Sequence, residues 1–213
     1  MKEKCAACED LYELYDSDVR GAKANVVKKL DEMTLQELWE LFPVCLVQHR
    51  TEWKAWYINE KERLTALFAE EAIIVHHVGS TAVDGICAKP IIDILIEVSS
   101  QYALSEVKEK LIENGYRCMF ESEKKISLNL GYTENGFAQK VFHVHLKKRG
   151  DNDELYFRDY LRDNVNVAKE YESLKCALLK KYKHNRDAYT EAKTEFITRN
   201  TIKAKEIYKN RYS

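Results

Sequence analysis

The chain of 213 residues carries 34 lysines and arginines against 35 aspartates and glutamates, so its charges nearly balance. This balance excludes a generally basic protein that binds nucleic acid or an anionic membrane surface over a broad face, and any anion site must be local. The length suffices for one sizeable core, or for a compact core with a helical appendage.

Targeting signals and cysteine usage indicate the compartment. No apolar run approaches the length of a membrane-spanning helix, and the charged N-terminus lacks the apolar segment of a signal peptide. The six cysteines are scattered without the density of a secreted disulfide framework. Cys5 and Cys8 form a C-x-x-C, but no second pair accompanies it, which disfavours a zinc or redox role. We therefore expect a cytoplasmic protein with reduced thiols.

The first 42 residues are charged and helical in pattern. Thr34-Leu-Gln-Glu37 has the spacing of a capping box and predicts a short helix that ends before Pro43. We interpret residues 1–42 as a helical N-terminal extension of a domain over 43–213. From residue 51 to 70, tryptophans and other apolar residues recur at helical spacing, which predicts a longer helix with one core face.

A strand-rich region follows, broken by one helix over 102–113 that ends at Asn114-Gly115. The predicted strands are Ile73 to Val78, Ile91 to Val98, Tyr116 to Phe120, Ile126 to Leu130 and Val141 to Leu146. The pattern is then wholly helical, with predicted helices over 154–162, 165–182 and 187–209. The fold class is therefore α+β, with a sheet core at about 72–148 and a helical tail over 153–209.

The motif His77-Val-Gly-Ser-Thr81 leaves the first of these strands. A glycine allows the backbone to turn sharply and to come close to a ligand, and Ser80 and Thr81 then offer hydroxyls and backbone N–H groups to phosphate. The alternative is a strand-ending glycine followed by a serine that caps a helical turn.

Asp93 lies within the apolar run Ile91-Ile-Asp-Ile-Leu-Ile96, where an unpaired carboxylate is costly. Its candidate partners are a metal ion and Lys89. A second metal-binding acid would be expected two residues on, but that position is Leu95. Glu97 faces the same side and lies about 13 Å from Asp93 in an extended strand, too far to share one magnesium ion.

Two further pairs could do chemistry. His143 and His145 share one face of a strand, where they could bind a transition metal, donate to a phosphate or act as a general base. They could equally be the polar face of a half-exposed strand. Arg158 and Arg162 are four apart on a helix and could clamp phosphate oxygens, although a solvated helix face has the same pattern.

Three sequence blocks together resemble the GrpB family, which is placed in the nucleotidyltransferase superfamily with polymerase-beta-like enzymes. They are His77-Val-Gly-Ser-Thr-Ala-Val-Asp-Gly with Ala88-Lys-Pro-Ile-Ile-Asp-Ile, the strand His143-Val-His145, and Tyr156-Phe-Arg-Asp-Tyr-Leu-Arg162 with Ala188-Tyr-Thr-Glu-Ala-Lys193. The resemblance implies a mixed sheet with flanking helices, in which Gly79 and Ser80 hold nucleotide phosphates and Asp93 begins an acidic metal-binding pair. Leu95 departs from the superfamily pattern, which has a second acid there.

The sequence thus predicts a protein that binds a nucleoside triphosphate and a divalent metal, Mg or Mn, and transfers a nucleotidyl group to an unknown acceptor. The alternative, motivated by Leu95, is a catalytically degenerate nucleotide-sensing or interaction module. The expected residues are Asp93, His143, His145 and Lys89 for catalysis, Asp93, His143 and His145 for the metal, and Gly79, Ser80, Thr81, Arg158 and Arg162 for the nucleotide. No membrane partner and no general nucleic-acid partner are expected.

Overall fold

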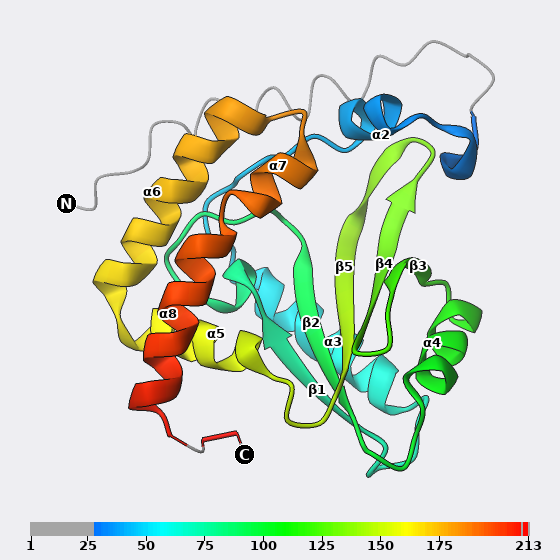
Figure 1. Ribbon diagram of the computed structural model, residues 1–213. Helices are drawn as coiled ribbons and strands as arrows, with labels where there is room; N and C mark the ends of the chain where they lie inside the picture. The colour runs from blue at the N-terminus through cyan, green and yellow to red at the C-terminus, as the bar shows by residue number, and fades with distance from the viewer. Residues whose placement is uncertain (1–27, 210, 213) are drawn as a thin grey trace.

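A five-stranded mixed sheet forms the centre of the protein (Figure 1). The computed structural model describes residues 28–209 together with 211 and 212. The strands are β1 (Ile73–Val78), β2 (Ile92–Val98), β3 (Arg117–Glu121), β4 (Lys125–Thr133) and β5 (Gly136–Lys148). They lie in the order β1-β2-β5-β4-β3, with β2 and β5 parallel and the other three pairs antiparallel. The expected mixed α+β architecture is confirmed.

Helices cover both faces of the sheet. They are α2 (Leu35–Leu41), α3 (Glu52–Thr65), α4 (Leu104–Glu113), α5 (Asp153–Asp163), α6 (Val165–Tyr182), α7 (Arg186–Glu191) and α8 (Thr194–Ile207), with short 3-10 turns η2 (Leu30–Glu32) and η3 (Ser80–Ala82). Helices α3 and α4 pack on the face that carries the isoleucines of β2. The helical tail from α5 to α8 lies over the opposite face, as Figure 1 shows.

Alternation along the central strands separates a dry face from a polar one. Ile92, Ile94 and Ile96 are fully buried against α3 and α4, where their large apolar side chains form the main core. The intervening residues of β2 and β5, among them Asp93 and His143, point to the other face. Asp93 of β2 and the histidines of β5 therefore lie beneath the helical tail.

The short N-terminal helix forms as its capping box predicts. The Thr34 hydroxyl accepts from the Glu37 backbone N–H at 3.2 Å, and the Glu37 carboxylate accepts from the Thr34 N–H at 2.7 Å. Phe42 caps the end of α2, and its ring packs 4.7 Å from that of Tyr132 in β4. The C-x-x-C of Cys5 and Cys8 lies outside the described residues. Among the helices described, none has the length and apolar character needed to cross a membrane.

The last predicted helix, 187–209, is wrong as a single element. The chain forms α7 and α8 instead, with a break at Ala192 and Lys193, where the Lys193 N–H bonds back to the Thr190 carbonyl at 3.2 Å. No glycine or proline marks this break, so helical periodicity runs through it. The break matters because it brings Lys193 to the polar face of the sheet.

Candidate active site

The turn after β1 lies directly against Asp93. Gly79 has a φ of +71°, a conformation that a side chain disfavours, and Ser80 then begins the 3-10 turn η3. A Cβ added to Gly79 would lie 2.8 Å from Asp93 Cβ and 2.9 Å from Asp93 Cγ, closer than real Cβ atoms approach. Glycine is therefore required both for the backbone conformation and for the approach to the carboxylate.

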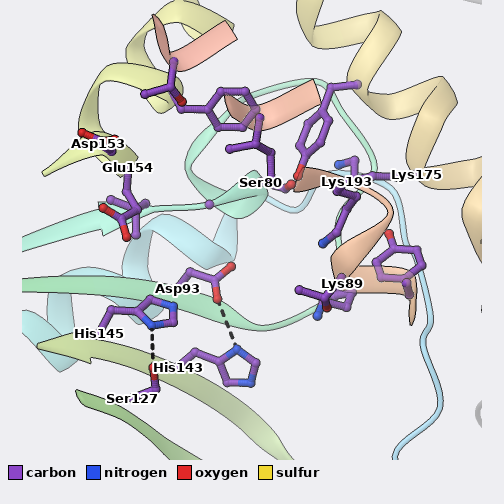
Figure 2. A pocket seen from close by; sticks show the side chains of 18 of the residues that line it. Ser80, Lys89, Asp93, Ser127, His143, His145, Asp153, Glu154, Lys175 and Lys193 are labelled. Carbon is purple, nitrogen blue, oxygen red and sulfur yellow. Dashed lines mark hydrogen bonds and ion pairs between the residues drawn. The ribbon is translucent and has the colours of Figure 1, made fainter. Parts of the chain in front are cut away.

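The partner of Asp93 is a histidine on the neighbouring strand. Parallel pairing of β2 and β5 sets Asp93 beside His143, and Asp93 Oδ1 lies 3.3 Å from His143 Nδ1 (Figure 2). From the sequence, the candidate partners of Asp93 are a metal ion and Lys89. The contact with His143 was not predicted. The second carboxylate oxygen, Oδ2, is the atom nearest to the Gly79 turn. The carboxylate is thus held between His143 and Gly79.

Both ring nitrogens of His143 have a polar partner, since Nδ1 contacts Asp93. Its Nε2 lies 2.8 Å from the hydroxyl of Tyr132 on β4, and that hydroxyl accepts from Nη2 of Arg186 on α7 at 2.7 Å. His145, two residues along β5, has its Nδ1 3.3 Å from the hydroxyl of Ser127. The two histidines share a face, as expected, but they have different surroundings.

Leu95 occupies the position at which the superfamily pattern predicts a second metal-binding acid. It pairs with His145 across β2 and β5 and is fully buried against Val78 and Leu155. Glu97, further along β2, accepts from the backbone N–H of Gly150 at 2.9 Å and bonds His76 at the same distance, away from the Asp93 cavity. The sheet therefore supplies one carboxylate to this site.

A cavity of about 920 Å³ opens over Asp93. Its walls come from the sheet and from the helical tail, and Figure 2 shows Lys89, Lys175 and Lys193 on one side of Asp93, with Asp153 and Glu154 on the other. The side chains with charge in its lining are Lys89, Lys125, Lys175, Arg186, Lys193, Lys205, Asp93, Asp153, Glu154 and Asp187. The charged side chains of the lining come from segments that lie far apart in the sequence.

Burial and mutual repulsion set the protonation states in the cavity. Desolvation, together with the nearby charges of Lys193 and Arg186, lowers the pKa of Lys89 from 10.5 to about 7. Burial by itself raises the pKa of Asp93, but the hydrogen bond from His143 and the charge of Lys89 outweigh it and hold that pKa well below its usual range. Desolvation lowers the pKa of His145 to about 3. At neutral pH, Asp93 is ionised and His145 is neutral.

The predicted phosphate clamp does not lie in this cavity. The Arg158 guanidinium donates to the His77 carbonyl at 3.0 Å, and that of Arg162 donates to the Ala82 carbonyl at 2.8 Å. Thr81 is buried, with its hydroxyl 3.0 Å from His77 Nε2. The two arginines hold the two ends of the Gly79 turn, whereas Gly79, Ser80, Thr81, Lys89, Asp93, His143 and His145 do converge on one cavity.

Sequence reasoning missed the tail residues of the site. Lys175, Arg186 and Lys193 reach the cavity from α6, α7 and the α7–α8 break. Lys193 had one signal, its place in the last block of the family resemblance, and the other two had none. Tyr132 was also missed, because a tyrosine in a strand reads as ordinary sheet composition.

A family model for the GrpB protein matches residues 43–203. The chain belongs to the GrpB family. The UPF0157 protein YqkA of Bacillus subtilis (strain 168) is 36% identical over 195 residues, covering 89% of this chain and 56% of that protein. The glutamate-rich protein GrpB of Alkalihalophilus pseudofirmus is 38% identical over 160 residues, covering 72% of this chain and 91% of that protein. This GrpB chain thus spans little more than half the length of YqkA.

A solved structure shows the same fold. The conserved protein GrpB from Enterococcus faecalis superposes with a TM-score of 0.66 at 27% sequence identity, covering 76% of this chain and 98% of that chain. The family match begins at residue 43, the residue at which we expect the domain to begin.

The position of Arg158 leads to a stability prediction. Replacing Arg158 with Gln removes its bonds to the His77 carbonyl and to Asp159, and we expect the free energy of unfolding to fall by about 2 kcal/mol. Urea denaturation measures this change. The control is Arg149→Gln, whose exposed guanidinium reaches one carbonyl and which should change stability by about 0.5 kcal/mol or less. Unchanged stability with loss of phosphate binding would instead support the predicted clamp.

Proposed function

We propose that this GrpB protein binds a nucleoside triphosphate with a divalent metal ion in the Asp93 cavity and transfers a nucleotidyl group to an acceptor hydroxyl. One observation carries the proposal: an ionised carboxylate is held against a glycine-serine turn in a cavity that is lined by several cations. A turn that exposes backbone N–H groups, close to lysine and arginine side chains, favours a phosphate chain as the ligand.

The cations give the cavity a charge that a polyanion would balance. Burial lowers the pKa of Lys89, and repulsion by Lys193 and Arg186 adds to that effect, so an anion among these side chains relieves the repulsion. Lys175 lines the same wall, and burial lowers its pKa to about 8. The whole lining holds six lysine and arginine side chains against four carboxylates, Asp93 among them, so the cations are in excess.

The donor set fits a metal ion that arrives with the nucleotide. Within residues 28–209, 211 and 212, no group of three or more His, Cys, Asp or Glu side chains is arranged to hold a metal ion. Mg²⁺ usually takes one or two carboxylates and completes its shell with phosphate oxygens and water. Asp93 would hold such an ion. Bound there, the metal would neutralise charge on the phosphates.

The remaining chemistry is positioning. Gly79 and Ser80 would orient the phosphate chain, and Lys89 and Lys193 would stabilise the charge that develops on it. No described residue is hydrogen-bonded to Nε2 of His145, which lines the cavity. A pKa of about 3 makes His145 a weak base, so we assign it to orient the acceptor hydroxyl by accepting its hydrogen bond.

Leu95 favours a second candidate function. Because the second acid of the superfamily pattern is replaced by a buried leucine, the same site could bind nucleotide without turning it over. The protein would then be a nucleotide-sensing or interaction module on a degenerate transferase scaffold. Both functions require nucleotide binding, but only the first releases pyrophosphate.

Thermal unfolding of the full chain with each nucleoside triphosphate, with and without Mg²⁺ or Mn²⁺, tests the shared step. We expect metal-dependent stabilisation by at least one nucleotide. Pyrophosphate release in a screen of hydroxyl acceptors would then establish transfer. Stabilisation without pyrophosphate release would select the degenerate module, and no stabilisation by any nucleotide would overturn both functions.

Anion binding should depend on pH through Lys89. The free protein loses the Lys89 proton as pH rises through about 7, whereas a bound anion favours the charged amine, so affinity for tripolyphosphate should fall toward pH 8.5. Arginine stays charged, so the ratio of wild-type to Lys89→Arg affinity should drop by about tenfold between pH 6.5 and 8.5. Isothermal titration calorimetry measures both proteins in the same buffers, which cancels the ionisation of tripolyphosphate itself. A constant ratio would contradict this role of Lys89.

A further inference from the structure

A chain of two hydrogen bonds and one ion-pair contact runs from the helical tail through two strands to Asp93. Arg186 Nη2 lies 2.7 Å from the Tyr132 hydroxyl, which lies 2.8 Å from His143 Nε2. His143 Nδ1 in turn lies 3.3 Å from Asp93 Oδ1 (Figure 2). The four side chains come from α7, β4, β5 and β2. They form one continuous polar connection beneath the cavity.

The two ends of this chain fix the direction of every bond in it. An arginine guanidinium can only donate, so the Tyr132 hydroxyl accepts from Arg186 and has its own proton left for His143 Nε2. An ionised carboxylate can only accept, so His143 Nδ1 must carry the proton that faces Asp93. A neutral His143 is therefore held in the form with the proton on Nδ1 and a bare Nε2.

Packing holds Tyr132 in place for this role. Its ring lies 4.7 Å from that of Phe42 and 5.1 Å from that of Phe137, measured between centroids. The Arg186 guanidinium carbon lies 5.4 Å from the Tyr132 ring centroid, and the His143 ring stacks at 5.9 Å with an interplanar angle of 21°. The hydroxyl thus has little freedom to leave His143.

We propose that Tyr132 is a positioning residue, whose hydroxyl, oriented by Arg186, fixes the tautomer and ring of His143 so that His143 holds the Asp93 carboxylate in place. Oδ1 is then occupied by His143, and Oδ2 is the oxygen that faces the Gly79 turn. Both nitrogens of His143 are used in this arrangement, so neither is left for a metal ion or a substrate proton.

The two histidines of β5 therefore have different roles. His143 supports Asp93 from behind, in the manner of a partner that orients a ligand-binding carboxylate. His145 bonds Ser127 through Nδ1, and no described side chain occupies its Nε2. The sequence pattern His143-Val-His145 suggested one shared function, and the bonds around each ring separate them.

Imidazole nitrogen spectra of the 15N-labelled full chain test this proposal without any ligand. We expect His143, assigned by its loss in His143→Gln, to carry its proton on Nδ1 at neutral pH. In Tyr132→Phe, which keeps the ring and removes the hydroxyl, both His143 nitrogen signals should shift as Nε2 loses its donor. The matched control is Tyr189→Phe, because the buried Tyr189 hydroxyl has no hydrogen-bond partner among the described residues. It should leave His143 unchanged.

Chemical labelling gives a second readout. Diethylpyrocarbonate acylates a bare imidazole nitrogen, so His145 should react before His143 in the wild-type protein. Freeing Nε2 in Tyr132→Phe should speed the labelling of His143 by about fivefold, the equivalent of one hydrogen bond. Arg186→Gln, which leaves Tyr132 in place, should give a smaller change of the same sign and serves if the Phe variant fails to fold. The proposal would be overturned if His143 carries its proton on Nε2 in the wild-type protein. It would also be overturned if neither the His143 nitrogen signals nor its labelling rate changes in Tyr132→Phe.

Discussion

Asp93→Asn is expected to abolish metal-dependent stabilisation by nucleoside triphosphates while preserving the fold. Asparagine keeps the shape of the side chain but removes the charge, and the loss of a buried charge from a binding site typically costs about 3 kcal/mol, roughly a hundredfold in affinity. The measurement is the change in melting temperature with Mg²⁺ and nucleotide, compared with the ligand-free variant.

The matched control for this experiment is Asp187→Asn. Asp187 lines the same cavity but is exposed on α7, so its replacement should leave most of the nucleotide effect intact. Equal losses of nucleotide-dependent stabilisation in the two variants would show that only the overall charge of the cavity matters and that Asp93 makes no specific contact with the ligand. If Asp93→Asn keeps full stabilisation by nucleotide and metal, then Asp93 does not take part in binding them.

The ligand-free protein should also depend on Asp93 in a pH-dependent way. Because the pKa of Asp93 is lowered in the folded protein, its contribution to stability is complete above the ordinary pKa of 3.8 and is lost as pH falls through the lower folded value. The difference in unfolding free energy between wild type and Asp93→Asn should therefore be full at pH 6 and shrink below pH 4. Urea denaturation of both proteins, at pH 6 and below pH 4, measures this difference in unfolding free energy.

The second large effect is expected from Gly79→Ala. The new methyl group would meet Asp93 Cβ at 2.8 Å, and the residue would have to keep a φ of +71°. A backbone with φ of 71° and ψ of −172° is used almost only by glycine and costs an alanine about 1–3 kcal/mol, and overpacking adds about 1–3 kcal/mol, so the free energy of unfolding should fall by about 4 kcal/mol. Because the clash is with Asp93 itself, binding of metal and nucleotide should be lost as well.

Gly85→Ala separates the two causes. Gly85 has a φ of +74° in the same connection, but nothing lies within 4 Å of an added Cβ. It should carry the backbone cost of about 1–2 kcal/mol and leave nucleotide binding unchanged. If both alanine variants lose the same stability, then contact with Asp93 contributes nothing and the close approach of the turn is not what requires glycine.

Local patterns were sufficient for most of the secondary structure. The capping box of Thr34 and Glu37 places the start of α2, and strict alternation in β5 sends His143 and His145 to one face. These signals are readable because each depends on residues a few positions apart. The break between α7 and α8 has no such signal, and β5 starts five residues earlier than its apolar run.

The sequence by itself determined the family, and the resemblance to that family implied the mixed sheet. The Gly79 turn and the acid at Asp93 could be predicted because each depends on a short run of residues. Tertiary structure alone decided what surrounds Asp93. His143 reaches it because β2 and β5 are adjacent and parallel, and Lys193 lines its cavity because the helical tail folds back over the sheet. The tertiary structure also places the Arg158 guanidinium against the His77 carbonyl and outside the Asp93 cavity. Residues that are distant in the chain come together only when the helices and strands pack. The residue spacing around Asp93 therefore does not show which distant side chains will contact its carboxylate.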